Sequence, residues 1–251
     1  DIKFSQMAVK NYTVFFNESG LPSNLKWSVT LNGTTVSTYQ NTIYFNLPNG
    51  TYYYSVETPI AVGNGTEYTT TGSGVLIVDG SGVEIVVTYT EEFYLDIRAT
   101  PLGGGNVSPS SGWYPAGMDI TLYPSAYAGY IFINWTGTGD GSYTGAQPTA
   151  NIVMKGPINE TALFAKVYNV KFTESGLRTG TSWGVSIINT AGTVLFQNLT
   201  TNDFVTFNLP NGTYSFRVTN VSGYTVSPRS GKITVSGEQI SISVQFSTIP
   251  Q

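Results

Sequence analysis

The segment FNLPNGTY occurs twice in the sequence, at 45–52 and again at 207–214. The repetition extends further, because NESGLPSNLKWSVTLNGT at 17–34 aligns with TESGLRTGTSWGVSIINT at 173–190. The alignment offset grows between these blocks, so the second copy carries about six additional residues near AGTVLFQNLTTND. An insertion that leaves its flanks unchanged belongs in a hairpin loop. The repetition predicts a structural unit that is folded twice.

Each copy has the pattern of β-strands. NYTVFF and KWSVTL alternate apolar and polar residues, which is the period of a half-buried strand, and LNGTT is a hairpin turn. We predict that TIYFNL and TYYYSV form a hairpin across Pro48-Asn49-Gly50, because Pro presets φ and Asn-Gly tolerates positive φ. GVLIVDG and GVEIVVTYT are predicted to form another hairpin, joined by DGSG. No segment sustains a helical period, so the predicted fold class is all-β.

The segment between the copies is a different unit. Strands are predicted at YLDIRA, MDITLYPS, YIFINW, ANIVM and ETALFAKV, and Gly/Pro-rich turns join them. Linkers are almost absent, since TYTEEFYLDI and LFAKVYNVKF run from one unit into the next. We therefore predict three tandem β-sandwich (Ig-like) domains, the first and third homologous. The predicted bounds are 1–10 for an extended N-terminal strand, 11–91 for the first repeat, 92–167 for the central domain and 168–251 for the second repeat.

The composition excludes several classes of function. Only 10% of the residues are charged, the net charge is −4, and the basic residues form no stripe, so nucleic acid is a poor partner. No apolar run is long enough to span a membrane. Cys and His are absent, which excludes disulfides, thiolate metal sites and the Ser-His-Asp and Cys-His triads. Low charge without His also fits an acidic exterior, where carboxylates titrate.

Carboxylate pairs are the remaining catalytic option. No acidic residue lies in an Asp-Thr/Ser-Gly motif, and Glu18 and Glu174 occupy equivalent repeat positions, which favours a turn-stabilising role. GTGDGSYTG at 137–145 and DGSG at 79–82 lack the carboxylate density of a calcium loop. Tyr52, Tyr53 and Tyr54 alternate along a strand, which is typical of core and cross-strand pairs rather than a sugar-binding stripe. We expect no catalytic residue, no metal, no cofactor and no enzymatic activity.

Asn-x-Ser/Thr sequons are more frequent than the composition predicts. They are Asn11, Asn17, Asn32, Asn49, Asn64, Asn106, Asn134, Asn159, Asn198, Asn211 and Asn220. Two interpretations remain open: N-glycosylation of an exported protein, or turn chemistry in a Thr-rich β protein. The first residue is Asp1 and not Met, which predicts a processed or trimmed N-terminus and is consistent with export to the cell surface or the extracellular space.

The outer units resemble a β-sandwich repeat of secreted archaeal proteins. The pattern is Y-x-V-x-F-x-E-S-G-L-P, W-x-V-x-L-N-G and F-x-L-P-N-G-T-Y-x-Y-x-V, carried at 12–22, 27–33 and 45–56. The second copy departs from it at Arg178 and Thr190. The resemblance implies a surface-layer protein, a thread-like filament or the domains beside the catalytic part of thermopsin-like acid proteases. The central unit resembles a bacterial-type surface repeat, with G-G-x-V-x-P-x-S-G, Y-P-A-G and G-Y-x-F-x-x-W at 104–112, 114–117 and 129–135.

The N-terminal segment DIKFSQMAVK precedes the first repeat as FAKV precedes the second. It is therefore predicted to be the last strand of a domain outside this chain. Three interpretations remain open: a donor strand for a neighbouring subunit, a remnant of a trimmed parent, or a tail. As a donor it would place Ile2, Phe4, Met7 and Val9 in the subunit contact, and a head-to-tail contact that does not close generates a filament.

Three functions follow from these predictions. The first is a glycosylated structural subunit of an archaeal surface filament, whose partners are copies of itself. The second is the non-catalytic C-terminal part of a thermopsin-like secreted protease. The third is a surface-layer or adhesin stalk.

Overall fold

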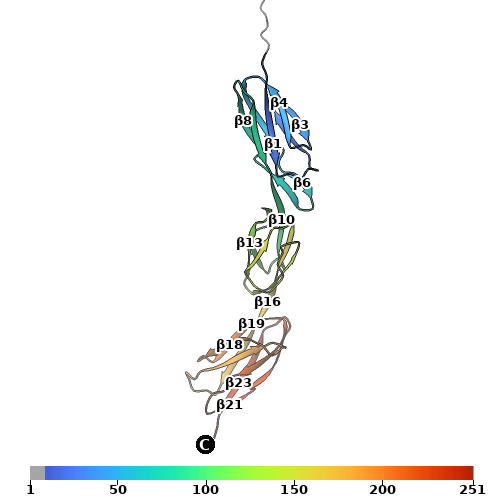
Figure 1. The fold of residues 1–251 in the computed structure, drawn as a ribbon. Coiled ribbons are helices and arrows are strands. Elements are labelled where there is room, and N and C mark those ends of the chain that lie inside the picture. The colour runs from blue at the N-terminus through green and yellow to red at the C-terminus, as the bar shows by residue number, and fades with distance from the viewer. Residues whose placement is uncertain (1–8, 251) are drawn as a thin grey trace, which may run out of the picture. The chain divides into compact units, whose positions relative to one another are not determined.

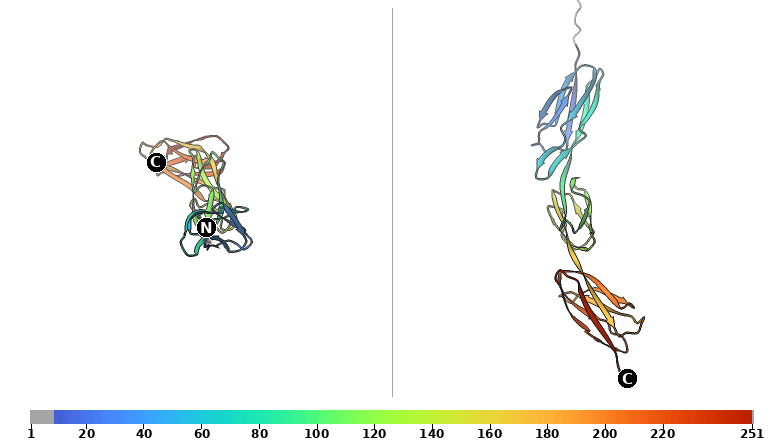
Figure 2. Two further views of the ribbon diagram at one scale, coloured as in Figure 1. Left: turned by 90° about the horizontal axis from the view of Figure 1, so that it is seen from above. Right: turned by 180° about the vertical axis from the view of Figure 1, so that it is seen from behind.

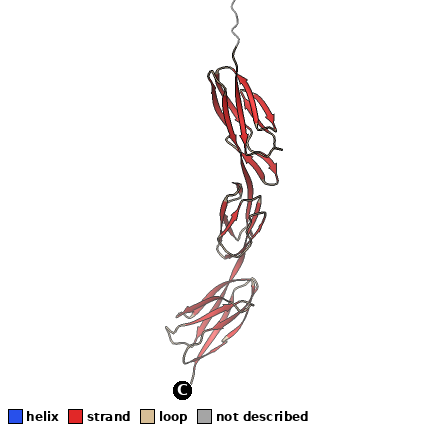
Figure 3. Ribbon diagram, viewed as in Figure 1, coloured by secondary structure: helices blue, strands red, loops and turns tan. Residues whose placement is uncertain are grey.

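The computed structural model describes residues 9–250. Strands account for 64% of the described residues, among which no helix occurs (Figure 3). The predicted all-β fold class is therefore confirmed. In the described part of the chain, no helix has the length and hydrophobicity needed to cross a membrane.

The chain divides into two compact units. Of the described residues, the first comprises 9–98, 108–123 and 135–161, and the second comprises 99–107, 124–134 and 162–250. Each unit holds one complete repeat, while the residues of the predicted central domain are divided between the two. The three-domain division stays a prediction.

The first repeat is a sandwich of two sheets, one mixed and one antiparallel (Figures 1 and 2). Its strands are β1 (Tyr12–Ser19), β2 (Trp27–Leu31), β3 (Thr34–Thr38), β4 (Thr42–Leu47), β5 (Gly50–Val56), β6 (Ile60–Gly63), β7 (Thr66–Thr69), β8 (Ser73–Val78) and β9 (Val83–Thr88). One sheet has the order β4-β1-β9, in which β9 runs parallel to β1, and the other has the order β3-β2-β5-β8. β6 and β7 form a hairpin that pairs with β10 (Thr90–Thr100).

Alternation in the sequence determines which side chains meet between these sheets. Val14, Phe16 and Trp27 point inward from β1 and β2 and are fully buried, while their neighbours along each strand are more exposed. Phe16 packs edge-on against Phe45 and Tyr54, with ring centroids 6.0 and 5.1 Å apart. Burial of such aromatic side chains between two sheets is the main stabilising contribution of a sandwich.

The second repeat has the same architecture. Its strands are the C-terminal part of β16 (Ile158–Ser175), then β17 (Trp183–Ile188), β18 (Val194–Thr200), β19 (Phe204–Pro210), β20 (Gly212–Val218), β21 (Tyr224–Ser227), β22 (Ser230–Val235) and β23 (Ile240–Thr248). β16 pairs with β19 and runs parallel to β23, which pairs with β21, and the facing sheet has the order β18-β17-β20-β22. The homology of the two repeats thus extends from sequence to strand order.

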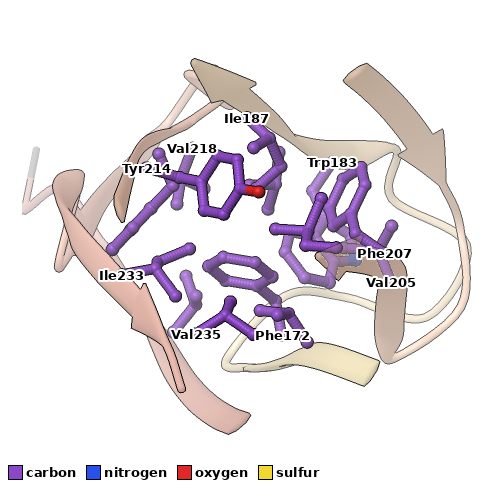
Figure 4. Packing of buried hydrophobic residues seen from close by; sticks show 14 of the residues in the cluster. Phe172, Trp183, Ile187, Val205, Phe207, Tyr214, Val218, Ile233 and Val235 are labelled. Carbon is purple, nitrogen blue, oxygen red and sulfur yellow. The ribbon is translucent and has the colours of Figure 1, made fainter. Parts of the chain in front are cut away.

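The core of the second repeat combines aromatic and aliphatic side chains, and its aromatic contacts repeat those of the first (Figure 4). Phe172 packs edge-on against Phe207 and Phe216, as Phe16 does against Phe45 and Tyr54. The buried Trp183 indole donates from Nε1 to the carbonyl of Asn202 at 2.8 Å. Trp27 makes the same bond to Gln40 at 2.8 Å, which satisfies its one donor inside the core.

The remaining strands lie between the repeats in the sequence. They are β11 (Gly105–Ser108), β12 (Gly112–Pro115), β13 (Asp119–Ala126), β14 (Tyr130–Thr138) and β15 (Ala150–Val153). Within the first unit β12 pairs with β10, and β13 pairs with β15. Each predicted central strand is therefore confirmed as a strand, and β11 and β12 are additional ones.

The two predicted hairpins at PNG and DGSG are wrong. β4 and β5 belong to different sheets, and so do β8 and β9. Each connection carries the chain from one layer of the sandwich to the other instead of reversing it within a sheet. The same turn residues serve both geometries, because Pro, Asn and Gly specify local φ values and not the strand with which the next segment pairs.

Side chains of FNLPNGTY hold the inter-sheet corner in place. The Tyr52 hydroxyl donates to the carbonyl of Pro48 at 2.9 Å, and the Asn49 Oδ1 accepts from the backbone N–H of Gly80 at 2.9 Å. Gly80 lies in DGSG, so Asn49 ties the two inter-sheet connections together.

The second repeat reproduces this corner bond for bond. Tyr214 donates to the carbonyl of Pro210 at 2.9 Å, and Asn211 accepts from the N–H of Gly237 at 2.8 Å. The identical segment is therefore required by one shared corner geometry.

The hairpin predicted at LNGTT is confirmed. Leu31 pairs with Thr34, and Asn32 and Gly33 have φ of 49° and 80°, as a two-residue hairpin loop requires. In the second repeat Ile187 pairs with Phe196 and, after a register shift, Ile188 pairs with Val194, so the loop between the paired residues is 189–193. The additional residues therefore lie in this hairpin, as predicted, and are shared between a longer loop, one more strand pair and the irregularity at Leu195.

The Glu-Ser-Gly-Leu motif forms a second shared corner. Glu18 Oε2 accepts from the N–H of Leu21, and Glu174 Oε2 accepts from the N–H of Leu177, both at 3.3 Å. The predicted turn-stabilising role of both carboxylates is confirmed. In the second copy Gly176 has a φ of 100°, and a Cβ there would lie 2.0 Å from the carbonyl oxygen of Phe246.

Gly176→Ala is expected to destabilise the second repeat strongly. The positive φ alone costs a non-glycine residue about 1–2 kcal/mol, and relieving the overlap with the Phe246 carbonyl costs roughly 1–3 kcal/mol more. Gly192→Ala is the matched control, because Gly192 has a φ of 86° and nothing within 4 Å of its Cβ position. Urea unfolding of both variants measures the difference, and equal midpoints would contradict the close-approach argument.

Candidate functional site

The acidic residues do not gather into a metal-binding cluster in the described part of the chain. No group of three or more Asp and Glu side chains there is close enough to hold a metal ion. The ion pair found among residues 9–250 joins Arg98 to Asp96 on the surface. A hollow of about 700 Å³ in the second repeat is lined by Arg229, Tyr224, Ile249 and neighbouring residues and by no carboxylate.

Glu160 is the most unusual carboxyl group. Its side chain is fully buried, and its Oε1 accepts from the N–H of Tyr143 at 2.7 Å. Its Oε2 is buried without a hydrogen-bond partner among the described residues. Burial raises the pKa of Glu160, and the Tyr143 bond lowers it to a smaller extent. The surroundings of Glu160 therefore favour its protonated form. The sequence alone did not mark Glu160 as a candidate.

The buried carboxyls predict greater stability in acid. Burial raises the pKa of Glu18, Glu67 and Glu160 above the ordinary value of 4.5. A carboxyl with a raised folded-state pKa contributes stability that is complete below the unfolded-state value and is lost as the pH rises through the folded-state value. Glu160→Gln, a mimic of the protonated acid, should raise Tm by about 2–4 °C at pH 7 and leave it unchanged at pH 3.

The exposed Glu238 supplies the control for this experiment. Glu238→Gln should shift Tm little at either pH, since an exposed surface substitution changes stability by less than about 0.5 kcal/mol. Equal Tm values for Glu160→Gln and the parent chain across this pH range would refute the burial argument.

The three consecutive tyrosines alternate as predicted. Tyr52 and Tyr54 pack against the core of the first repeat, and Tyr53 is 74% exposed on the outer face. One exposed ring, beside Asn32 and Thr51 in a small hollow, is not a stripe of stacking platforms.

The sequon side chains are exposed at every predicted position except Asn17 and Asn134, which are half-buried. Asn17 donates from Nδ2 to Glu84 Oε1 at 2.6 Å and accepts from the Thr42 hydroxyl at 2.8 Å. The Oδ1 of Asn134 is buried without a hydrogen-bond partner in residues 9–250. Exposure leaves the other asparagines open to modification, and their glycosylation stays a prediction.

The predicted subunit-contact residues lie mostly beyond the described part. Ile2, Phe4 and Met7 are outside residues 9–250. Val9 is exposed, and the adjoining Lys10 ammonium lies 5.0 Å from the ring centroid of Tyr12.

The structure reveals one apolar surface that sequence reasoning missed, on the edge strand β18. Val194, Leu195, Phe196 and Leu199 on this strand are all exposed. The corresponding strand β3 reads TTVST and is polar apart from Val36. Alignment of VLFQNLT with TTVST could have found this difference, but the insertion in the preceding loop obscured the register.

Comparison with known proteins assigns one segment to a family model. Residues 95–168 match the divergent InlB B-repeat domain, a bacterial surface repeat. The matched segment coincides with the predicted central domain, and the resemblance to a bacterial-type surface repeat is supported there. No curated protein sequence matches the chain.

Among solved structures, the similar chains are β-rich surface proteins at low identity. The Bacillus anthracis TIE protein is 14% identical over 95% of this chain and 51% of that chain, with a TM-score of 0.31. BcpA, the major pilin subunit of Bacillus cereus, is 12% identical over 96% of this chain and 100% of that chain, with a TM-score of 0.29. This chain spans about half the length of the first. At these TM-scores no argument about function rests on the similarity.

Proposed function

We propose that this chain is a structural, non-enzymatic subunit of an extracellular filament at an archaeal cell surface. In this proposal the N-terminal segment of one copy pairs as a strand with a neighbouring copy, and the exposed sequons carry N-glycans. The surface-repeat match of residues 95–168 supports a location outside the cell. Assembly through the N-terminal segment is proposed by analogy with the strand that precedes the second repeat.

β16 runs without interruption from Ile158 to Ser175. Its N-terminal part precedes the second repeat as residues 1–10 precede the first. Ile158, Ala162 and Phe164 of this part are buried, and the N–H of Val167 donates to the carbonyl of Gly129 at 2.8 Å. In this chain the residues before a repeat therefore form a paired strand with a buried face.

Residues 1–10 have the pattern to do the same on another copy. Ile2 and Phe4 alternate with Lys3 and Ser5, so one face is apolar. A strand added to a sheet gains main-chain hydrogen bonds, and its apolar side chains provide the specific contacts. Such a contact joins the start of one copy to a different surface of the next, and its repetition generates a filament.

Deletion of residues 1–10 is expected to abolish assembly. Electron microscopy of the purified native protein and of the deletion variant measures this. The parent chain should form uniform unbranched fibres. The double variant I2D/F4D should also fail to assemble, because charge cannot enter an apolar contact. The matched control K3D/S5D changes the other face of the same segment and should leave fibres intact.

Other outcomes would contradict this function. Fibres from the deletion variant would exclude the strand exchange. A monodisperse monomer, with mass-spectrometric peptides of a longer parent, would favour domains attached to a secreted protease. Single particles that bind a glycan array would favour an adhesin stalk.

A further inference from the structure

The edge strand β18 differs from its counterpart β3 at four aligned positions, and at three of them an apolar side chain is gained or lost. The strand registers place Phe196 where the first repeat has Thr34, and Leu199 where it has Ser37. At the third position the exchange runs the other way, since Asn198 replaces the half-buried Val36. Edge strands are ordinarily kept polar, as β3 is, because their unpaired backbone attracts other strands. The substitutions create a Phe-x-Asn-x-Thr sequon on an edge.

Phe196, Asn198 and Thr200 lie on the same side of β18, because alternate residues of a strand share a face. Their ladder partners Ile187, Val185 and Trp183 are all buried. Phe196 is nonetheless 44% exposed, with its ring centroid 6.5 Å from that of Phe207. One part of the ring is therefore packed against the core and the other is open next to Asn198.

Thr200 has a structural explanation that the other two residues lack. Its hydroxyl accepts from the N–H of Asn202 at 3.0 Å, and Thr38 does the same for Gln40 at 3.0 Å. The amide of Asn198, by contrast, is exposed and makes no side-chain hydrogen bond within the described residues. Neither packing nor hydrogen bonding in the folded chain accounts for Asn198.

The spacing Phe-x-Asn-x-Ser/Thr occurs at three places, centred on Asn17, Asn134 and Asn198. The three asparagines differ in the exposure and hydrogen bonding of their amides. Asn17 is held on both sides of its amide by Glu84 and Thr42, and Asn134 is half-buried with a buried Oδ1. Among the three, Asn198 alone combines a free, exposed amide with an exposed Phe in the described structure.

We infer that Asn198 carries an N-linked glycan whose first sugar lies on the ring of Phe196 and covers the open edge of β18. The inference rests on the N-glycosylation in the proposed function and adds the particular site and its structural role.

The donor of the glycan is a lipid-phosphate-linked oligosaccharide. The bond between the anomeric carbon and the phosphate oxygen breaks, the Asn198 Nδ2–carbon bond forms, the lipid phosphate leaves with the electron pair, and the amide loses one proton to the transferase.

The geometry explains why a sugar suits this place. The face of a phenyl ring carries partial negative charge, and the axial C–H groups of a pyranose are its positive complement. A sugar on Asn198 is positioned two residues from Phe196 on the same face, within reach of the ring. The attached glycan also stands over the unpaired backbone of β18, and it replaces the protection that polar side chains give β3.

Mass spectrometry of glycopeptides from the native protein tests the site itself. The expected result is a glycan on Asn198 and none on Asn17, although both lie in the same spacing. Glycans on other exposed asparagines with a bare Asn198 would overturn this inference and leave the glycosylation in the proposed function intact. If every asparagine is unmodified, both the Asn198 glycan and the glycosylation in the proposed function are overturned. Fibre formation is measured separately by microscopy, so filament assembly is tested independently.

Thermal unfolding of the glycosylated parent and three variants tests the contact between sugar and ring. N198Q is expected to lower the Tm of the second repeat by about 2–4 °C. In the F196T background, which restores the residue of the first repeat, N198Q should change Tm by less than 1 °C. An equal loss in both backgrounds would show that the glycan does not use Phe196 and would overturn the contact. N220Q, at an exposed sequon outside β18, is the control and should leave Tm unchanged.

Discussion

Each repeat depends on the closure of two sheets over one aromatic core, and that closure depends on a corner where the chain changes sheet. Phe16 and Phe172 pack edge-on against rings of both sheets, and the chain crosses from one sheet to the other several times in each repeat. Asn49 and Asn211 join two such crossings by one hydrogen bond each. The identity of FNLPNGTY in both repeats follows from this bond and from the Tyr–Pro bond beside it.

The polar groups inside the molecule are arranged with little use of charge. The buried indoles of Trp27 and Trp183 donate to backbone carbonyls, and the corner carboxylates accept from backbone N–H groups. Glu160 is buried without a cation, and its pKa is raised by burial. A fold supported in this way loses few ion pairs among the described residues when carboxylates are protonated.

Sheet edges connect the proposed assembly with the proposed modification. A strand edge offers main-chain donors and acceptors to any extended segment, and a filament subunit must direct that chemistry to one place. Polar side chains cover β3, and the glycan at Asn198 would cover β18. Covering β3 and β18 would remove two of the sheet edges open to the N-terminal segment and so narrow its choice of acceptor, while β8 and β22 stand at the other ends of the same sheets.

Strand positions could be predicted from the sequence because alternation and β-branched or aromatic side chains are local properties. The LNGTT hairpin was also predictable, since Asn32 and Gly33 occupy positive φ within two residues. The PNG and DGSG connections were assigned to hairpins wrongly, because turn residues specify a reversal and not the partner of the next strand. The burial of Glu160 and the edge position of β18 could not be anticipated, since both depend on strands distant in sequence, whereas the apolar residues of β18 could have been found by alignment with TTVST.

The sequence by itself determined the all-β class, the repetition of one unit and the absence of His and Cys chemistry, because composition and short-range periodicity encode these. Only the tertiary structure decided which strands share a sheet, and with it that FNLPNGTY is an inter-sheet corner and that Asn17 and Asn198 differ. The physical reason is that strand pairing and burial are non-local: an amide is free or bound according to what a segment many residues away places beside it.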